Sequence, residues 1–193
     1  MTRRPTKLAF GGADLLGDGD GDYYLYIGRM IERKGYNIAQ EVCQRLGKRL
    51  ILAGPGEHSG YGEFVGSVGP EERARLMGGA IATFAPTLYI EPFGNVVVEA
   101  QACGTPTITT DWGAFTETNI NGFTGYRCRT LQEFMDAAEK VKTLDRKKIR
   151  EHAVGKYSVD VIAKQYEDYF KRLSTLWSNG WYQLAEKAGN ESI

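Results

Sequence analysis

The chain has 193 residues, of which 24 are Lys or Arg and 24 are Asp or Glu, so its formal net charge is zero. This balance argues against a protein that binds nucleic acid or an anionic membrane through its overall charge, and any recognition of phosphate must be local. Hydrophobic residues make up 42% of the sequence, enough for the core of an ordinary domain, and no apolar run approaches the ~20 residues that a membrane span needs.

The first 21 residues are polar and rich in Gly and Asp, and we expect them to form a flexible lead-in. They contain no apolar stretch of the kind that a secretory signal needs. The three cysteines, Cys43, Cys103 and Cys128, are odd in number and have no metal-binding spacing. We therefore expect reduced thiols and a cytoplasmic protein, and no metal site.

Strand and helix patterns alternate along the rest of the chain. Short β-rich runs predict strands at residues 23–27, 49–53, 63–68, 80–85, 107–110 and 124–127. Helical spacing of apolar residues predicts helices at 36–46, from Pro70 to Met77, in the apolar segment after Phe93, after a capping box at Thr130 and Glu133, and in a last core helix from about Ser158.

This alternation predicts an α/β fold, a doubly wound, Rossmann-like and mostly parallel sheet in a single domain at residues 22–175. In such sheets, ligands bind in the crevice at the carboxyl ends of the strands. Arg29, Gly54 and Glu91 each follow a predicted strand, so we expect the ligand at this edge of the sheet.

The loop after the first strand, Gly28–Gly35, carries two cations. Arg29 can grip a phosphate through its planar guanidinium, and Lys34 adds a mobile point charge. Gly28 permits close approach of the backbone to a ligand. The sequence of the loop by itself is also compatible with a solvated basic turn.

A second glycine pair, Gly54 and Gly56, follows the next strand and imitates a dinucleotide fingerprint. A fingerprint must open a helix, whereas the polar residues 57–62 lead into another strand, so we expect no nicotinamide or flavin site. This loop is close enough to the predicted crevice to border a base or a ribose. The histidines, His58 and His152, belong to no recognisable triad or metal pattern.

The segment from Glu91 to Glu99 is the most informative part of the chain. If its apolar part is a helix, the first amides lie near Phe93, Gly94 and Asn95 and are free to bind an anion, because helix N-termini carry unpaired N–H groups. Glu91 lies just outside this helix and Glu99 about one turn into it, so two hydrogen-bond acceptors flank an anion site. A ligand with hydroxyls at both ends and phosphate in the middle, such as a nucleotide sugar, fits this layout.

These segments together resemble the C-terminal, donor-binding half of the retaining nucleotide-sugar glycosyltransferases of GT-B architecture (glycosyl transferases group 1). The resemblance covers roughly residues 22–173 and depends on Arg29 with Lys34, Glu91 with Glu99, Phe93-Gly94, Gly104-Thr105-Pro106 and Glu117, in that order. Thr87 stands where many relatives have serine and keeps the hydroxyl. Glu117 either contacts the ligand or caps the helix that follows.

The resemblance implies a role for each site residue. Arg29 and Lys34 would hold the diphosphate, and Glu91 would contact the transferred sugar. Glu99 would bind the ribose hydroxyls, and the backbone amides of residues 93–96, which include Asn95 and Val96, would reach the sugar and the phosphates. The implied activity is transfer of a hexose from a UDP or GDP sugar with retention of configuration, with no cofactor besides this donor and no metal.

Length is the main departure from the family, whose members run to roughly twice this size. We expect the acceptor, a glycan or a lipid-linked sugar, to need an N-terminal GT-B domain in cis or in trans, and the isolated chain to be inactive or nearly so. The chain is an excised half, a natural half or a degenerate module. A sugar-nucleotide epimerase half and a non-catalytic nucleotide-sugar-binding module are the alternatives.

Residues 176–193 are expected to form an aromatic C-terminal tail beyond the domain, with Trp177, Trp181, Tyr182 and Leu184. In the family, this region crosses back to the N-terminal domain. The tail is therefore either a docking surface or an unstructured C-terminus.

Overall fold

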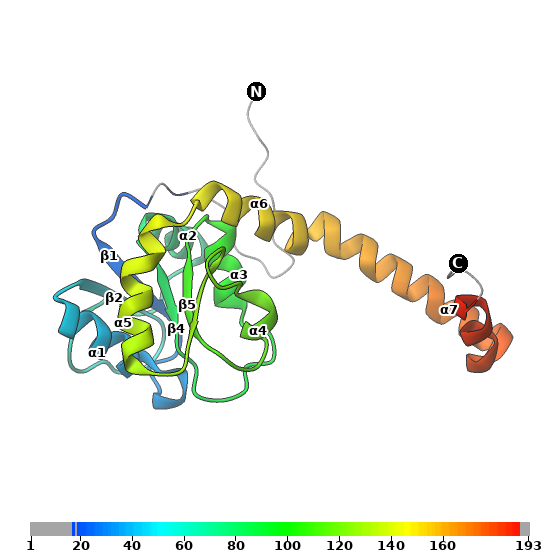
Figure 1. Ribbon diagram of the computed structural model, residues 1–193, viewed down its shortest axis with the longest axis horizontal. Coiled ribbons are helices and arrows are strands. Elements are labelled where there is room, and N and C mark those ends of the chain that lie inside the picture. The colour runs from blue at the N-terminus through cyan, green and yellow to red at the C-terminus, as the bar shows by residue number, and fades with distance from the viewer. Residues whose placement is uncertain (1–16, 18, 190–193) are drawn as a thin grey trace, which may run out of the picture.

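The computed structural model describes residue 17 and residues 19–189, with side chains as far as residue 174. Figure 1 shows an α/β domain from which one long helix extends. The strands are β1 (Tyr23–Ile27), β2 (Arg49–Ala53), β3 (Glu63–Phe64), β4 (Thr83–Ala85), β5 (Thr107–Thr110) and β6 (Gly125–Cys128). The helices are α1 (Tyr36–Leu46), α2 (Pro70–Gly79), α3 (Asn95–Ala102), α4 (Phe115–Thr118), α5 (Leu131–Lys140), α6 (Arg146–Tyr157) and α7 (Val159–Gly189), with 3-10 turns η1 (Glu32–Lys34) and η2 (Val141–Thr143).

The six strands form one sheet in the order β3-β2-β1-β4-β5-β6, and every neighbouring pair is parallel. This is the doubly wound order of a Rossmann-like fold, so the predicted fold class is confirmed. The chain winds outward in one direction from β1 to β3 and in the other from β4 to β6. The direction of winding therefore switches between β1 and β4, and a crevice opens there at the carboxyl ends of the strands.

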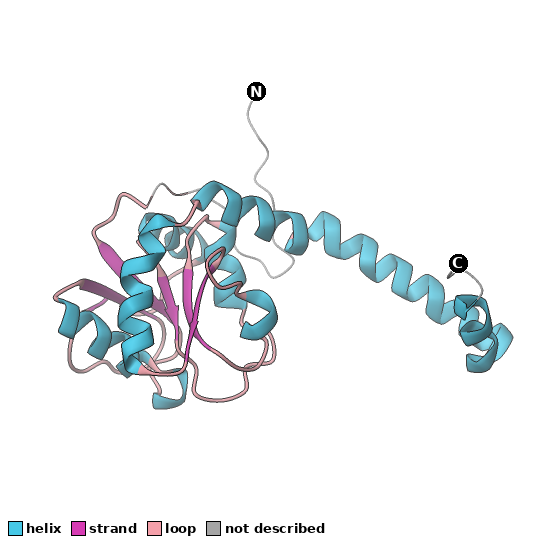
Figure 2. Ribbon diagram, viewed as in Figure 1, coloured by secondary structure: helices cyan, strands magenta, loops and turns pink. Residues whose placement is uncertain are grey.

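Helices cover both faces of the sheet, as Figure 2 shows. Successive side chains of a strand point to opposite faces. Tyr24 and Tyr26 of β1 accordingly pack in the core cluster that contains residues of α1 and α5. Leu25 and Ile27 pack in a second cluster with residues of α2 and α3. Helix α6 packs against α3, outside this second cluster.

Several element boundaries differ from the predicted ones. β3 ends at Phe64 rather than at residue 68, because Gly66 takes a left-handed conformation (φ 73°) that breaks an extended strand. β4 begins at Thr83 rather than at residue 80, because the amide of Ala80 caps the end of α2 by donating to Leu76 and Met77. The capping box at Thr130 and Glu133 is confirmed at the start of α5.

The last helix, α7, leaves the domain rather than packing on its core (Figure 1). Tyr166, Tyr169 and Phe170 are 59%, 55% and 60% exposed, so the expectation of a last core helix is wrong. The predicted tail continues this helix as far as Gly189. Residues 190–193 and the side chains of the four tail residues named above lie outside the described part.

Most of the predicted lead-in, residues 1–16 and 18, also lies outside the described residues. The amides of Gly17, Gly19 and Gly21 donate to carbonyls of Cys103, Gly78 and Gly79. Within the described part of the chain, no helix combines the length and the apolar character that crossing a membrane requires.

Candidate functional site

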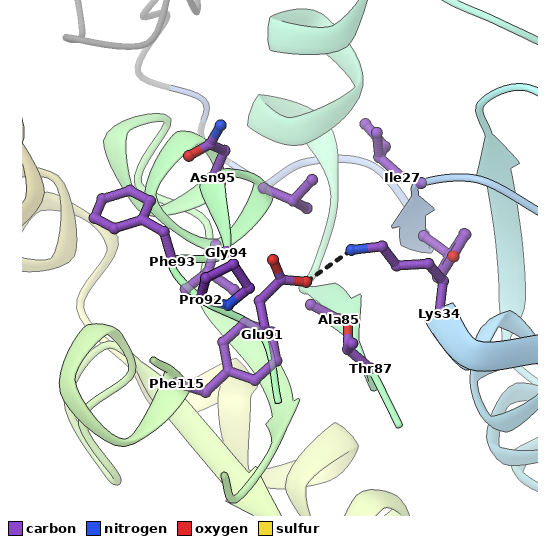
Figure 3. A pocket seen from close by; sticks show the side chains of 14 residues that line it. Ile27, Lys34, Ala85, Thr87, Glu91, Pro92, Phe93, Gly94, Asn95 and Phe115 are labelled. Atoms are coloured by element: carbon purple, nitrogen blue, oxygen red, sulfur yellow. Dashed lines mark hydrogen bonds and ion pairs between the residues drawn. The ribbon is translucent and has the colours of Figure 1, made fainter. Parts of the chain in front are cut away.

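A cavity of about 300 Å³ opens at the switch point between β1 and β4 (Figure 3). Its walls come from the end of β1, the loop after it, the loop after β4 and the first turn of α3. The lining residues are Tyr26, Ile27, Gly28, Lys34, Ala85, Thr87, Glu91, Pro92, Phe93, Gly94, Asn95, Val96, Val97 and Phe115. The cavity lies where the fold predicts a ligand crevice.

Close backbone contact holds the loop after β1 against the loop after β4. Gly35 has φ 73°, and a Cβ at this position would lie 2.0 Å from the carbonyl oxygen of Pro86, so glycine is required on both counts. Next to this contact, the amide of Leu88 donates to the carbonyl of Arg33 over 2.8 Å. The loop that carries Lys34 is thereby fixed beside the loop that carries Glu91.

Lys34 and Glu91 form an ion pair inside the cavity, with 2.7 Å between Nζ and Oε2 (Figure 3). The side chains are 22% and 13% exposed, so water screens the pair only in part. Burial lowers the pKa of Lys34, but the hydrogen bonds and charges of Glu91 and Tyr89 outweigh this effect and leave that pKa above its ordinary value. A protonated ammonium and a carboxylate therefore share the cavity.

The N-terminus of α3 forms the opposite wall. Gly94 precedes the helix with φ 80°, and a Cβ there would lie 2.5 Å from the ring of the buried Phe115. No side chain caps this helix end. Its first amides, at Asn95 and Val96, therefore face a lined cavity without a capping oxygen, which is the arrangement of an anion site.

Glu99 lies in the same helix but outside the cavity lining. It is buried, and Nη1 of Arg73 in α2 reaches both of its carboxylate oxygens, at 3.1 and 3.3 Å. Burial raises the pKa of Glu99, and the charge and hydrogen bonds of Arg73 reduce this effect only in part. Nε of Arg73 is itself buried and has no hydrogen-bond partner among the described residues.

The structure thus brings most of the predicted site residues together. Gly28, Lys34, Glu91, and the four residues from Phe93 to Val96 line one cavity, whereas Arg29 and Glu99 do not. Arg29 follows β1 as predicted, with an exposed side chain. Glu117 is exposed on the short helix α4.

The sequence did not indicate Phe115, Tyr89 or Arg73, which respectively line the cavity, contact Glu91 and contact Glu99. Phe115 lines the cavity, and its position just after β5 could have indicated this. Tyr89 donates to Glu91, and its place two residues earlier was a weak signal. Arg73 lies in α2, and nothing in the local sequence marks it.

The other candidate motifs do not line the cavity, although Gly54 lies against the backbone of Gly28, which does. Gly54 and Gly56 follow β2 and lead through a loop to β3, so they do not open a helix, as the sequence predicted. The three cysteines are buried and form no disulfide. Among the residues that the structure describes, no three His, Cys, Asp or Glu side chains come together as a metal site.

Comparison with known families agrees with this geometry. The family model described as Glycosyl transferases group 1 matches residues 13–160, most of the chain. The chain belongs to the glycosyl transferases group 1 family. The resemblance inferred from Arg29, Lys34, Glu91 and Glu99 is therefore confirmed at the level of the family.

Individual relatives of this glycosyltransferase domain are longer proteins. Glycogen synthase of Mycobacterium tuberculosis is 35% identical over 122 residues, which are 54% of this chain and 29% of that protein. A probable sucrose-phosphate synthase of Thermosipho melanesiensis is 33% identical over 130 residues, 58% of this chain and 31% of that protein. The matched segments make up about three tenths of these curated relatives.

The fold has solved counterparts of GT-B architecture. The crystal structure of AviGT4, a glycosyltransferase involved in avilamycin A biosynthesis, matches with a TM-score of 0.69 and 26% identity. The match covers 82% of this chain and 52% of AviGT4. The glycosyltransferase domain described here thus spans about half of a GT-B chain.

Proposed function

We propose that this chain is the donor-binding domain of a glycosyltransferase that transfers a hexose from a UDP or GDP sugar with retention of configuration. The observation that carries the proposal is the cavity at the switch point. There, the ammonium of Lys34, the carboxylate of Glu91 and the uncapped start of α3 meet within about 300 Å³. The cavity lies at the lower end of the range of small-molecule sites, roughly 300–1,000 Å³.

The proposed chemistry depends on neutralising charge. As the bond between the sugar and the diphosphate breaks, negative charge grows on the β-phosphate. Lys34, Arg29 and the amides at the start of α3 would stabilise this charge, and preorganised groups of this kind usually supply the largest share of catalysis. In this proposal the reaction needs no metal, because two cations and a helix end take its place.

The remaining roles follow from position. Glu91 would accept a hydrogen bond from the transferred sugar, and Glu99 from the ribose once the nucleotide reaches the pair with Arg73. Arg29 would turn toward the diphosphate on binding, which its exposed side chain permits because exposed rotamers exchange quickly. The absence of a disulfide among the three buried cysteines supports the proposal of a reducing, cytoplasmic location.

The proposal includes a second GT-B domain, in cis or in trans, that carries the acceptor, a glycan or a lipid-linked sugar. A groove of about 470 Å³ at the junction of α6 and α7 supports the proposal of such a partner domain. Its lining is Phe93, Tyr157, Ile162, Gln165, Tyr166 and Tyr169. Phe93 also lines the donor cavity, so a domain seated in this groove would stand next to the donor sugar.

Calorimetric titration with uridine, UDP, GDP and ADP tests the donor site. We expect the chain to bind UDP or GDP. Arg29→Ala should lower the affinity for that diphosphate by roughly tenfold or more, because hydrogen bonds to charged groups contribute ~1.5–3 kcal/mol. Affinity for the free nucleoside should change little. Arg45→Ala, on the exposed surface of α1, is the matched control. No binding of any nucleotide would contradict the function, and equal losses for nucleoside and diphosphate would contradict the role of Arg29.

A further inference from the structure

The carboxylate of Glu91 is held on one side only. Lys34 Nζ lies 2.7 Å from Oε2, and the hydroxyl of Tyr89 donates to the same oxygen over 3.0 Å. The hydrogen bonds that the described residues make to this carboxylate all end on Oε2. A carboxylate oxygen has two lone-pair sites, so Oε2 is saturated, and Oε1 keeps its acceptor capacity.

Tyr89 is itself fixed in place. Its ring lies beneath the ammonium of Lys34, with 4.8 Å from Nζ to the ring centre, a cation–π contact. The indole N–H of Trp112 lies within hydrogen-bonding distance of two backbone carbonyls of this loop, 3.1 Å from that of Thr87 and 3.2 Å from that of Tyr89. At the other end of the loop, the amide of Ala114 donates to the carbonyl of Glu91 over 2.9 Å.

We propose that Tyr89 is a positioning residue, which locks the Glu91 carboxylate so that Oε1 alone is presented to a hydroxyl of the donor sugar. Tyr89 does not line the cavity, so it acts through Glu91 rather than by touching the ligand. The inference rests on the proposed function. It adds that sugar recognition depends on a phenol hydroxyl outside the cavity, while diphosphate recognition does not.

The test is Tyr89→Phe, which removes the hydroxyl and keeps the ring beneath Lys34. Affinities for UDP, UDP-glucose, GDP and GDP-mannose are measured by calorimetry. We expect the variant to bind the preferred sugar nucleotide about threefold to tenfold more weakly, the effect of one hydrogen bond, and the matching diphosphate within about twofold. Tyr61→Phe is the control, because it removes a hydroxyl that donates to the carbonyl of Lys48, away from the cavity.

A double-mutant cycle with Glu91→Gln separates positioning from a general loss of structure. In the Glu91→Gln background, Tyr89→Phe should add no further loss of sugar-nucleotide affinity. Additive losses, or an unchanged preference for sugar nucleotide over diphosphate in Tyr89→Phe, would overturn the inference and leave the proposed function standing. A wild-type chain that binds no nucleotide would overturn the proposed function, and the inference with it.

Discussion

Glu99, which we propose as a ribose-binding group, carries a buried charge that lowers the stability of the fold. The side chain is only 8% exposed, and burial raises its pKa despite the adjacent Arg73. Above the ordinary Glu pKa of 4.5, the unfolded chain releases this proton more readily than the folded chain does, so ionisation favours unfolding. This loss of folding stability is absent below pH 4.5, and it grows as the pH rises toward the folded-state pKa.

Glu99→Gln should therefore melt at a higher temperature than the wild type at pH 7, because Gln keeps the shape and an acceptor for Arg73 without the buried charge. The difference should shrink as the pH falls below 4.5. The same variant should bind UDP or GDP roughly tenfold more weakly. Thermal melts across pH measure the first effect, with Glu57→Gln in an exposed loop as the control. A lower midpoint than the wild type at pH 7 would contradict the argument.

At the scale of one element, helix α3 begins where it does because of Gly94. The left-handed conformation of Gly94 turns the chain from the loop into the helix, and the missing side chain leaves room for Phe115. This turn aims the first amides of the helix into the cavity. The helix start is thus determined jointly by a local backbone requirement and by a ring from the segment after β5.

Gly94→Ala should destabilise the domain by about 1–3 kcal/mol, because the new Cβ is strained at this φ and meets a buried ring. Gly155→Ala is the matched control, since this glycine is exposed within α6 and a Cβ there meets nothing within 4 Å. The free energy of unfolding of the control should rise by about 0.5–1 kcal/mol. Urea unfolding measures both changes, and equal stability of Gly94→Ala and wild type would show that the turn is not constrained as described.

At the scale of the whole molecule, the proposed nucleotide site lies within the domain, whereas α7 extends away from it. Tyr166 and Phe170 stack with their ring centres 6.1 Å apart and are both more than half exposed. An exposed aromatic face of this kind marks an interaction surface. It borders the groove that shares Phe93 with the cavity at the switch point, so we expect donor binding and sugar transfer to be separable in this chain.

We therefore expect the 193-residue chain to bind its sugar nucleotide without transferring the sugar. Ligand at 100 times its dissociation constant should stabilise the chain by ~2.7 kcal/mol, which a thermal-shift assay detects. Release of UDP or GDP in the presence of acceptor glycans should stay at background until a GT-B N-terminal domain is supplied. Replacing Tyr166 and Phe170 by serine should then reduce release and leave nucleotide affinity unchanged. Efficient transfer by the chain alone would contradict the separation of donor binding from sugar transfer.

Much of the fold could be predicted because its cues are local. The apolar run of β1 ends at a glycine, and Thr130 with Glu133 forms a capping box, so each marks an element boundary by itself. The alternation of such elements implies a parallel sheet, and the parallel sheet places Lys34 and Glu91 at one edge. The cavity was predictable to this extent.

The sequence by itself determined the order of the elements and the edge of the sheet where the cavity lies, because periodicity and turn residues act over short distances. The family followed from the resemblance carried by the motif residues. Only the tertiary structure decided which groups meet. Arg73 reaches Glu99 across 26 residues of chain. Lys34 reaches Oε2 of Glu91 across 57 residues of chain, and Tyr89 donates to the same oxygen. The apolar spacing of α7 likewise predicted a helix but not its exposure, because a pattern shows which face is apolar and not what covers it.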